Sequence, residues 1–298
     1  GDTGAIAIGV GTFAARSAVN AGSAVHMAGI EVRHKAILLA ASMLKVSPEK
    51  LDIGAGYVYN VAQPDQRKSL REIAIYAAGS PGYALPGEVT PGLEHTAYFT
   101  APQASYCNGT HVVEVEVDPM TGGVHLTNYV VAHDSGNVIN PMIVDGQVQG
   151  GIAHGIGNAM FEWMKYDDGA QPLTTTFQDY LLPSAPEVPG AHIEHVETPN
   201  PLNPLGVKGA GEGGTIPAPA AIISAIEDAL SPFGVHFTNI PLTPAQIVKA
   251  LQAPDVIANY KAQGITPVGN TPAQFDKFVR DEISKWTKII RDAGIKLE

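Results

Sequence analysis

Apolar residues recur every three or four positions along residues 18–44, which is the spacing of one helical face. The members of this stripe are Val25, Ala28, Val32, Ala36, Leu39 and Met43. A shorter helix is predicted over residues 69–78, because Ser69 and Glu72 have the spacing of a capping box. Further helices are expected over residues 144–164, over residues 220–230, and after the Thr-Pro-Ala-Gln sequences that begin at Thr243 and Thr271.

Residues 111–133 alternate between apolar and polar side chains, as half-buried strands do. Val113, Val115 and Val117 alternate with acidic residues, and a turn sequence over 118–123 separates them from a second run. A β-hairpin is therefore predicted, with His111 and His125 on opposite strands, where they could pair. Further strands are expected in residues 5–15, in residues 51–60 as a pair, and within residues 172–198, around Asp179-Tyr180 and the proline-rich residues 182–186. Residues 79–108 are expected to be irregular.

Composition limits the kinds of function that this chain can have. Hydrophobic residues make up 45% of its 298 residues and charged residues only 16%, which is typical of a well-packed globular protein. The net charge of −11, with no Lys/Arg cluster, argues against a nucleic-acid surface. Cys107 is the single cysteine, so an internal disulfide and a set of iron–sulfur thiolates are both excluded. The first residues show neither an initiator Met nor a signal sequence, and they resemble the interior of a longer polypeptide.

Glu212 lies in a glycine-rich loop, residues 206–215, shortly before the apolar run that begins at residue 220. Glycine permits close approach of the backbone to a ligand, and the start of a helix favours negative charge. Residues 9–16 and 146–151 are glycine-rich as well, and the three segments together could cradle a phosphate-bearing cofactor. Tight helix packing explains these glycines equally well, and Glu212 in a solvent-facing turn is the alternative for the loop.

Several familiar catalytic motifs are absent from the sequence. There is no helical zinc-protease pattern, no nucleophile elbow and no phosphate-binding loop. The glycines at Gly9 and Gly11 lack the third member of a dinucleotide fingerprint. His154 could face a ligand from the glycine-rich helix, although a packed and hydrogen-bonded histidine is the simpler interpretation. No set of protein ligands for a metal ion is predicted.

A series of motifs follows in one order along the chain. They are Glu114-Val115-Glu116-Val117-Asp118-Pro119, Asp134 to Pro141, Gln147-Val148-Gln149-Gly150-Gly151, Asp179-Tyr180, Asn203 to Glu212, and Leu242-Thr243-Pro244. In this order they closely resemble the large subunit of the molybdenum hydroxylases, the family of xanthine dehydrogenase, aldehyde oxidase and aerobic carbon monoxide dehydrogenase. The resemblance covers roughly residues 1–251. It implies an α+β molybdopterin-binding domain with mixed sheets and packed helices.

The resemblance also implies roles for individual residues. Glu212 matches the catalytic glutamate of the family, beside Gly211, and Gln147 matches a glutamine that hydrogen-bonds the molybdopterin cofactor. The loop that lies against the cofactor is matched by Thr12, Ala14, Ala15, Arg16 and Ser17. In this chemistry a carboxylate accepts a proton while an oxygen from water is transferred to an electron-poor carbon. A base held in a loop that excludes water would suit that role near neutral pH.

The family resemblance implies partners for this chain. The chain matches only the C-terminal half of the molybdopterin-binding region, so the N-terminal half of the large subunit is expected as a partner. Iron–sulfur and flavin (FAD) subunits are expected to remove the electrons, and the cofactor is expected in its cytosine dinucleotide form. The implied reaction is hydroxylation of an aldehyde, an N-heterocycle or a similar small substrate in the cytoplasm. The chain alone is expected to be incomplete.

Residues 252–298 resemble a different family. Pro254-Asp255-Val256, Thr271-Pro272 and Trp286 are similar to the C-terminus of periplasmic solute-binding receptors of tripartite tricarboxylate transporters. We therefore expect a boundary between residues 251 and 252, followed by a short helical tail that would point to the periplasm. A non-catalytic scaffold, or a remnant of a solute-binding protein fused to a hydroxylase fragment, is the alternative function.

Overall fold

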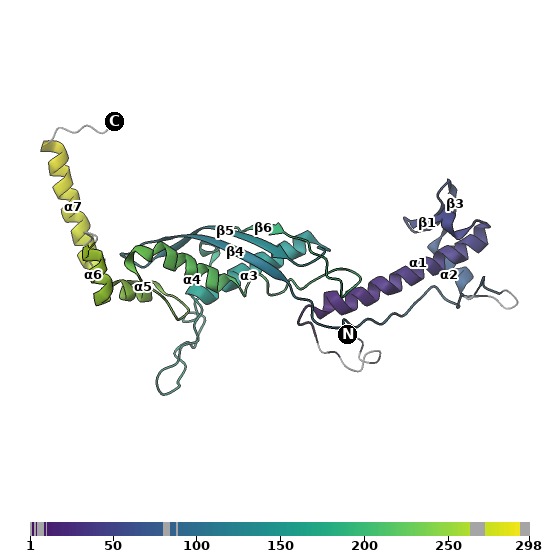
Figure 1. Ribbon diagram of the computed structural model, residues 1–298, viewed down its shortest axis with the longest axis horizontal. Helices are drawn as coiled ribbons and strands as arrows, with labels where there is room; N and C mark the ends of the chain where they lie inside the picture. Colours follow the sequence, from purple (N-terminus) through teal and green to yellow (C-terminus); the bar gives the residue numbers. More distant parts are fainter. Residues whose placement is uncertain are drawn as a thin grey trace. The chain divides into compact units, whose positions relative to one another are not determined.

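The computed structural model describes residues 2, 4, 9, 11–79, 84–87, 89–262 and 272–292 (Figure 1). Contacts divide the chain into two compact units. The first unit contains Gly1–Cys107, Asp134–Asn140 and Val196–Ala210. The second contains Asn108–His133, Pro141–His195 and Gly211–Glu298. Each unit therefore combines segments that are distant in the sequence.

The long helix expected near the start of the first unit is confirmed. A π-helical turn, η1 (Ser17–Gly22), leads into α1 (Ser23–Leu44), drawn in purple in Figure 1. Only the C-terminal half of the expected stripe is buried, since Ala36 and Leu39 are fully enclosed whereas Val25 is 72% exposed. The hydrophobic core of this unit therefore forms at one end of α1, together with residues of the following strands and helix.

A three-stranded sheet follows α1 and the short 3₁₀ helix η2 (Pro48–Lys50). The expected strand pair is confirmed as the antiparallel strands β1 (Leu51–Gly54) and β2 (Tyr57–Asn60). The third strand, β3 (Gln63–Ser69), was not predicted, because its polar sequence has no apolar alternation. The helix α2 (Leu70–Ala77) begins with the expected capping box, in which Glu72 N donates to Ser69 Oγ at 3.2 Å and Ser69 N donates to Glu72 Oε2 at 2.9 Å.

The second unit contains a sheet in the order β4-β5-β6. The predicted hairpin is confirmed as β4 (Asn108–Val117) and β5 (Val124–Asp134), and β6 (His192–His195) lies parallel to β5. Two helices, α3 (Pro141–Met160) and α4 (Ala218–Ala229), pack with this sheet around one apolar core (Figure 1). The remaining elements are η3 (Ala185–Glu187), η4 (Ser231–Phe233), α5 (Pro244–Leu251), α6 (Pro254–Ala262) and α7 (Pro272–Asp292).

Some expectations from the sequence are wrong or lie outside the described residues. Asp179 and Tyr180 lie in a turn and not in a strand, because the Asp179 carboxylate accepts hydrogen bonds from the Thr176 amide and hydroxyl. Residues 5–8 and Thr271 are not described, so the first strand and the last N-cap are not assigned. Thr243 does form its expected capping box.

The boundary expected after residue 251 stays a prediction. Val256, on α6, is buried in the same core as α3 and α4.

Within the described ranges, no helix has the length and apolar character that crossing a lipid bilayer requires.

The glycines of α3 divide into two kinds. A Cβ at Gly155 would overlap the Cβ of Ala218 on α4, and a Cβ at Gly151 would lie 2.9 Å from Gly214 Cα. By contrast, a Cβ at Gly146 or Gly150 would meet nothing within 4 Å. Tight packing therefore explains the first pair, and the second pair leaves exposed, bare backbone.

We predict opposite effects for Gly155→Ala and Gly146→Ala in the same helix. Gly155→Ala should lower the free energy of unfolding by about 1–3 kcal/mol, because α3 and α4 must move apart. Gly146→Ala should raise it by up to about 1 kcal/mol, because alanine is the better helix former and the site is open. Urea unfolding followed by circular dichroism measures both values, and equal effects would contradict this division of the glycines.

Candidate functional site

The loop that carries Glu212 has hydrogen bonds on three successive carbonyl groups. Gln147 Nε2 donates to Gly211 O at 2.8 Å. The amides of Thr215 and Ile216 donate to Glu212 O at 3.0 and 3.1 Å. His111 Nε2 lies 3.2 Å from Gly213 O. The backbone on both sides of Glu212 is thus fixed by side chains from α3 and β4.

The same loop is also held by close packing against β5 and α3. A Cβ at Gly213 would overlap the ring of His133, which is fully buried, and a Cβ at Gly214 would overlap the carbonyl oxygen of Val148 on α3. Glycine is therefore required at both positions by contact with the rest of the second unit. At Gly211, by contrast, a Cβ would meet nothing within 4 Å. The loop is packed after Glu212 and open before it.

The Glu212 side chain itself is exposed. The water-excluding loop expected from the sequence is not found, because the packed glycines cover the backbone and leave the carboxylate outside. The structure brings Glu212 together with two of the other predicted site residues, Gly211 and Gln147, within the second unit.

The surface around Gln147 suits a large polar ligand. Gln147 is exposed, and its neighbours Gly146 and Gly150 have open space where a side chain would lie. Together with Gly211, these residues present bare backbone beside a primary amide and a carboxylate. The residues of the second unit therefore fit the cofactor cradle that the sequence predicts. His154 follows on the same helix and is exposed.

The other predicted site residues form a loop in the first unit. Ala14 and Ala15 have left-handed φ angles of 49° and 58°, a conformation that costs about 1–3 kcal/mol for each non-glycine residue. Thr12 Oγ1 lies 2.7 Å from Ser17 Oγ, and the Arg16 guanidinium lies 5.0 Å from the centre of the Phe13 ring. The π-helical turn begins directly afterwards, at Ser17. Strained backbone and π-helical turns both occur preferentially at functional sites.

Sequence reasoning missed the contacts of His111. Its expected partner was His125, but His111 Nδ1 lies 2.9 Å from the Tyr129 hydroxyl. Burial lowers the pKa of His111, the carbonyl of Gly213 opposes that shift, and nearby His133 adds to it. Burial also raises the pKa of Tyr129. The alternation contained a signal for this position, since His111 has the same parity as Val113 and Val115 on the half-buried face of β4.

A buried ion pair in the first unit was also missed. Lys208 Nζ donates to Asp134 Oδ2 at 2.6 Å and to Thr198 Oγ1 at 2.5 Å, and the Thr198 hydroxyl also donates to Asp134. Burial alone would raise the pKa of Asp134. The Lys208 ammonium, the Thr198 hydroxyl and the amides of Gly136 and Thr198 outweigh burial and hold it well below its usual value. Nothing in the sequence pairs residues that lie 74 positions apart.

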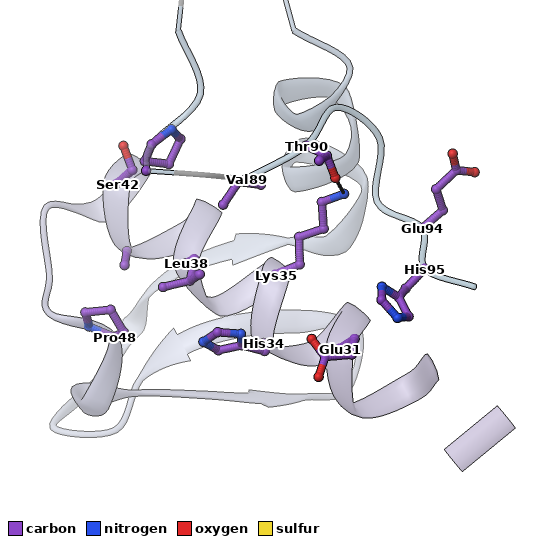
Figure 2. Close-up of a pocket in the computed structure, with 13 residues that line it drawn as sticks. Glu31, His34, Lys35, Leu38, Ser42, Pro48, Val89, Thr90, Glu94 and His95 are labelled. Carbon is purple, nitrogen blue, oxygen red and sulfur yellow. Dashed lines mark hydrogen bonds between the residues drawn. The ribbon is translucent and has the colours of Figure 1, made fainter. Parts of the chain in front are cut away.

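The first unit also contains a cavity of about 540 Å³ between α1 and residues 86–95. Figure 2 shows polar side chains at its edge, with Lys35 Nζ donating to Thr90 Oγ1 at 3.0 Å. None of the predicted site residues lines this cavity. Among the described residues, no three His, Cys, Asp or Glu side chains form a group that could hold a metal ion.

Comparison with known proteins identifies the family. The family model described as the molybdopterin cofactor-binding domain matches residues 1–189 of the sequence. The chain belongs to this family. The resemblance to molybdenum hydroxylase large subunits and the α+β fold are both confirmed. The first four motifs of the series, up to Asp179-Tyr180, lie within the matched residues.

Two relatives of this molybdopterin-binding chain come from Paenarthrobacter nicotinovorans. Nicotine 6-hydroxylase large subunit is 39% identical over 244 residues, which cover 82% of this chain and 30% of the relative. 6-Hydroxypseudooxynicotine dehydrogenase complex subunit gamma is 42% identical over 252 residues, which cover 84% of this chain and 31% of the relative. The crystal structure of quinoline 2-oxidoreductase from Pseudomonas putida 86 is similar with a TM-score of 0.73 and 37% identity, over 82% of this chain and 31% of that one. The chain thus spans somewhat less than one third of these proteins.

We predict that breaking the ion pair between Lys208 and Asp134 strongly destabilises the fold. Lys208→Met should lower the free energy of unfolding by about 3–5 kcal/mol, because it leaves a buried carboxylate without its cation. Lys277→Met is the matched control, since Lys277 forms an ion pair of the same length, 2.6 Å, with Asp281 on the exposed surface of α7. Lys277→Met should lower the free energy of unfolding by less than about 1 kcal/mol. Denaturant unfolding of the two variants measures the difference.

The same ion pair should make the free energy of unfolding depend on pH in the acidic range. The pKa of Asp134 is depressed in the folded chain, so its carboxylate contributes stability above the unfolded value of about 4 and loses it as the pH falls toward the folded value. The stability gap between the wild type and Lys208→Met should therefore shrink below about pH 4. Unfolding curves recorded between neutral and acidic pH measure this, and a gap that is constant with pH would contradict it.

Proposed function

We propose that this chain forms the part of a molybdenum hydroxylase large subunit that holds the molybdopterin cofactor and supplies the proton-accepting carboxylate. The observation that carries the proposal is the fixed Glu212 loop. Its backbone carbonyls are held at Gly211, Glu212 and Gly213, while the carboxylate stays accessible. A general base needs this combination of a rigid position and an open approach.

Each unit has its own set of residues that match the cofactor-binding segments of the family. In the second unit, Gln147 would donate or accept hydrogen bonds through its amide, and the bare backbone at Gly211 would allow close approach. In the first unit, the loop from Thr12 to Ser17 would lie against the cofactor, with Ala14 and Ala15 in the strained conformation. Strain of this kind persists where the surroundings fix the backbone, which fits a loop shaped for a ligand.

The proposed reaction converts a carbon–hydrogen bond of the substrate and one water into a carbon–hydroxyl group, two protons and two electrons. When bound, the molybdenum cofactor supplies the centre that transfers the oxygen and takes up the electrons. Glu212 accepts a proton at a carboxylate oxygen as the new carbon–oxygen bond forms. Because the backbone on both sides of Glu212 is held by hydrogen bonds, the loop itself needs little rearrangement during the reaction.

The proposed substrate class is an N-heteroaromatic ring. Nicotine 6-hydroxylase and quinoline 2-oxidoreductase are both named for oxidation at a numbered position, and their named substrates contain a pyridine ring. A carbon next to a ring nitrogen is electron-poor, which suits attack by an oxygen derived from water. Aldehydes and carbon monoxide are the other substrates that the sequence leaves open.

Further proteins would complete the enzyme. The rest of the large subunit and subunits with iron–sulfur clusters and FAD are the proposed partners, because the chain spans less than one third of its relatives and the two electrons need an acceptor. The cytosine dinucleotide form of molybdopterin and a cytoplasmic location belong to the same proposal.

We predict that molybdenum binds stoichiometrically when this chain is produced together with the rest of a large subunit. The reason is that the residues matching the family's cofactor-binding segments would then have their natural partner. Elemental analysis of the purified complex measures the metal. A folded complex without molybdenum would contradict the cofactor assignment.

We predict that Glu212→Gln abolishes hydroxylation and leaves the molybdenum content unchanged. The amide keeps the shape of the side chain but cannot accept the proton, so turnover should fall by at least about 10²–10⁴-fold. Glu116→Gln is the matched control, since Glu116 is exposed on β4, and its turnover should equal that of the wild type. Substantial turnover by Glu212→Gln would remove Glu212 from the role of base.

A further inference from the structure

We propose that His111 is a positioning residue for the Glu212 loop, and that Tyr129 selects the histidine tautomer that holds the loop. This inference rests on the proposed function only for the role of Glu212. The contact itself joins β4 of the hairpin to the loop, across 102 positions of sequence.

The partners of the two ring nitrogens determine the tautomer. Gly213 O is a carbonyl oxygen and can only accept, so His111 Nε2 must carry the hydrogen at 3.2 Å. In the neutral ring Nδ1 is then an acceptor, and the Tyr129 hydroxyl donates to it at 2.9 Å. The chain of donors therefore runs in one direction, from the Tyr129 O–H through the imidazole to the carbonyl of Gly213.

The surroundings favour the neutral ring. His111 is half-buried, Tyr129 is fully buried, and their rings meet edge to face at 5.6 Å and 79°. The titratable groups that face His111 are Tyr129, from β5, and His133, also from β5. Neither supplies a negative charge that would stabilise a protonated imidazole, because burial keeps the Tyr129 hydroxyl protonated.

The position of the contact gives it a role beyond packing. The carbonyl of Gly213 directly follows Glu212, and the carbonyl of Gly211 directly precedes it. Gln147 holds the first side, from α3, and His111 holds the second, from β4. Loss of the His111 donor leaves only one of the two side-chain hydrogen bonds that fix the backbone on either side of the carboxylate. A base that is misplaced by about 1 Å can lose about 100-fold in rate.

The test uses the assembled enzyme with four variants. His111→Leu removes the donor with similar volume, and His111→Gln restores an amide N–H that can reach the place of Nε2. Tyr129→Phe removes only the hydroxyl that selects the tautomer. His125→Leu is the matched control, because His125 is an exposed histidine on the same hairpin. Hydrogen–deuterium exchange of the peptide covering residues 209–216 is measured beside kcat, KM and molybdenum content.

We expect faster exchange over residues 209–216 in His111→Leu, with kcat lower by about 10- to 100-fold. The KM and the molybdenum content should be nearly unchanged. His111→Gln should bring the exchange rate and kcat most of the way back to the wild-type values. Tyr129→Phe should give intermediate values of both, and His125→Leu should match the wild type. A purely structural role for His111 would lower the yield or metal content without this pattern of rescue.

Unchanged exchange and unchanged kcat in His111→Leu would overturn the proposal. If that variant does not fold, unchanged exchange in Tyr129→Phe overturns it instead. The exchange measurement does not depend on the role of Glu212. Faster exchange in His111→Leu, combined with full turnover in Glu212→Gln, would therefore refute the proposed base and retain the positioning contact.

Discussion

The close approach of the Glu212 loop to α3 is the constraint on which the arrangement of the second unit depends. Gly214 lies against the carbonyl of Val148, and Gly151 lies against Gly214, so backbone meets backbone without intervening side chains. One turn further along, Gly155 allows α4 to pack on α3 through Ala218. The loop, both helices and the hairpin are thereby joined around one apolar core, which fixes the place of Glu212.

The Glu212 carboxylate is exposed to water because only the backbone of its loop is packed. The hydrogen bonds at Gly211 and Gly213 leave the Glu212 side chain outside the packed region. The backbone of a base in this position is held, but its carboxylate is not shielded from water by the described residues. Exclusion of water would then be the task of the cofactor, the substrate and the rest of the large subunit. This division agrees with a chain that spans less than one third of its relatives.

The first unit shows a different way of holding a functional segment. Its loop at Ala14 and Ala15 adopts strained backbone angles, and a Cβ at Gly209 would lie 3.0 Å from Ala15 Cβ, so this close approach also needs glycine. The nearby ion pair of Lys208 with Asp134 is buried and satisfied by hydrogen bonds. Buried charge pairs of this kind fix geometry more than they add stability relative to an apolar core.

Local signals in the sequence were sufficient for several helices and for the hairpin. The capping boxes at Ser69 and Thr243 and the alternation from His111 predicted helices and a hairpin that the structure confirms. These signals succeed because capping and periodicity involve residues that are near one another in the chain. The polar strand β3 carries no such periodicity, and Asp179 was misassigned because side-chain hydrogen bonds made its turn.

By itself, the sequence determined the family, most of the α-helices and the hairpin, and the candidate residues Glu212 and Gln147. Only the tertiary structure decided which glycines are packed and which are open, that His111 contacts Tyr129 and Gly213, and that Lys208 pairs with Asp134. Those contacts join residues far apart in the chain, so they depend on how helices and strands pack. Periodicity and capping carry no information about such distances, which is why the site needed the fold.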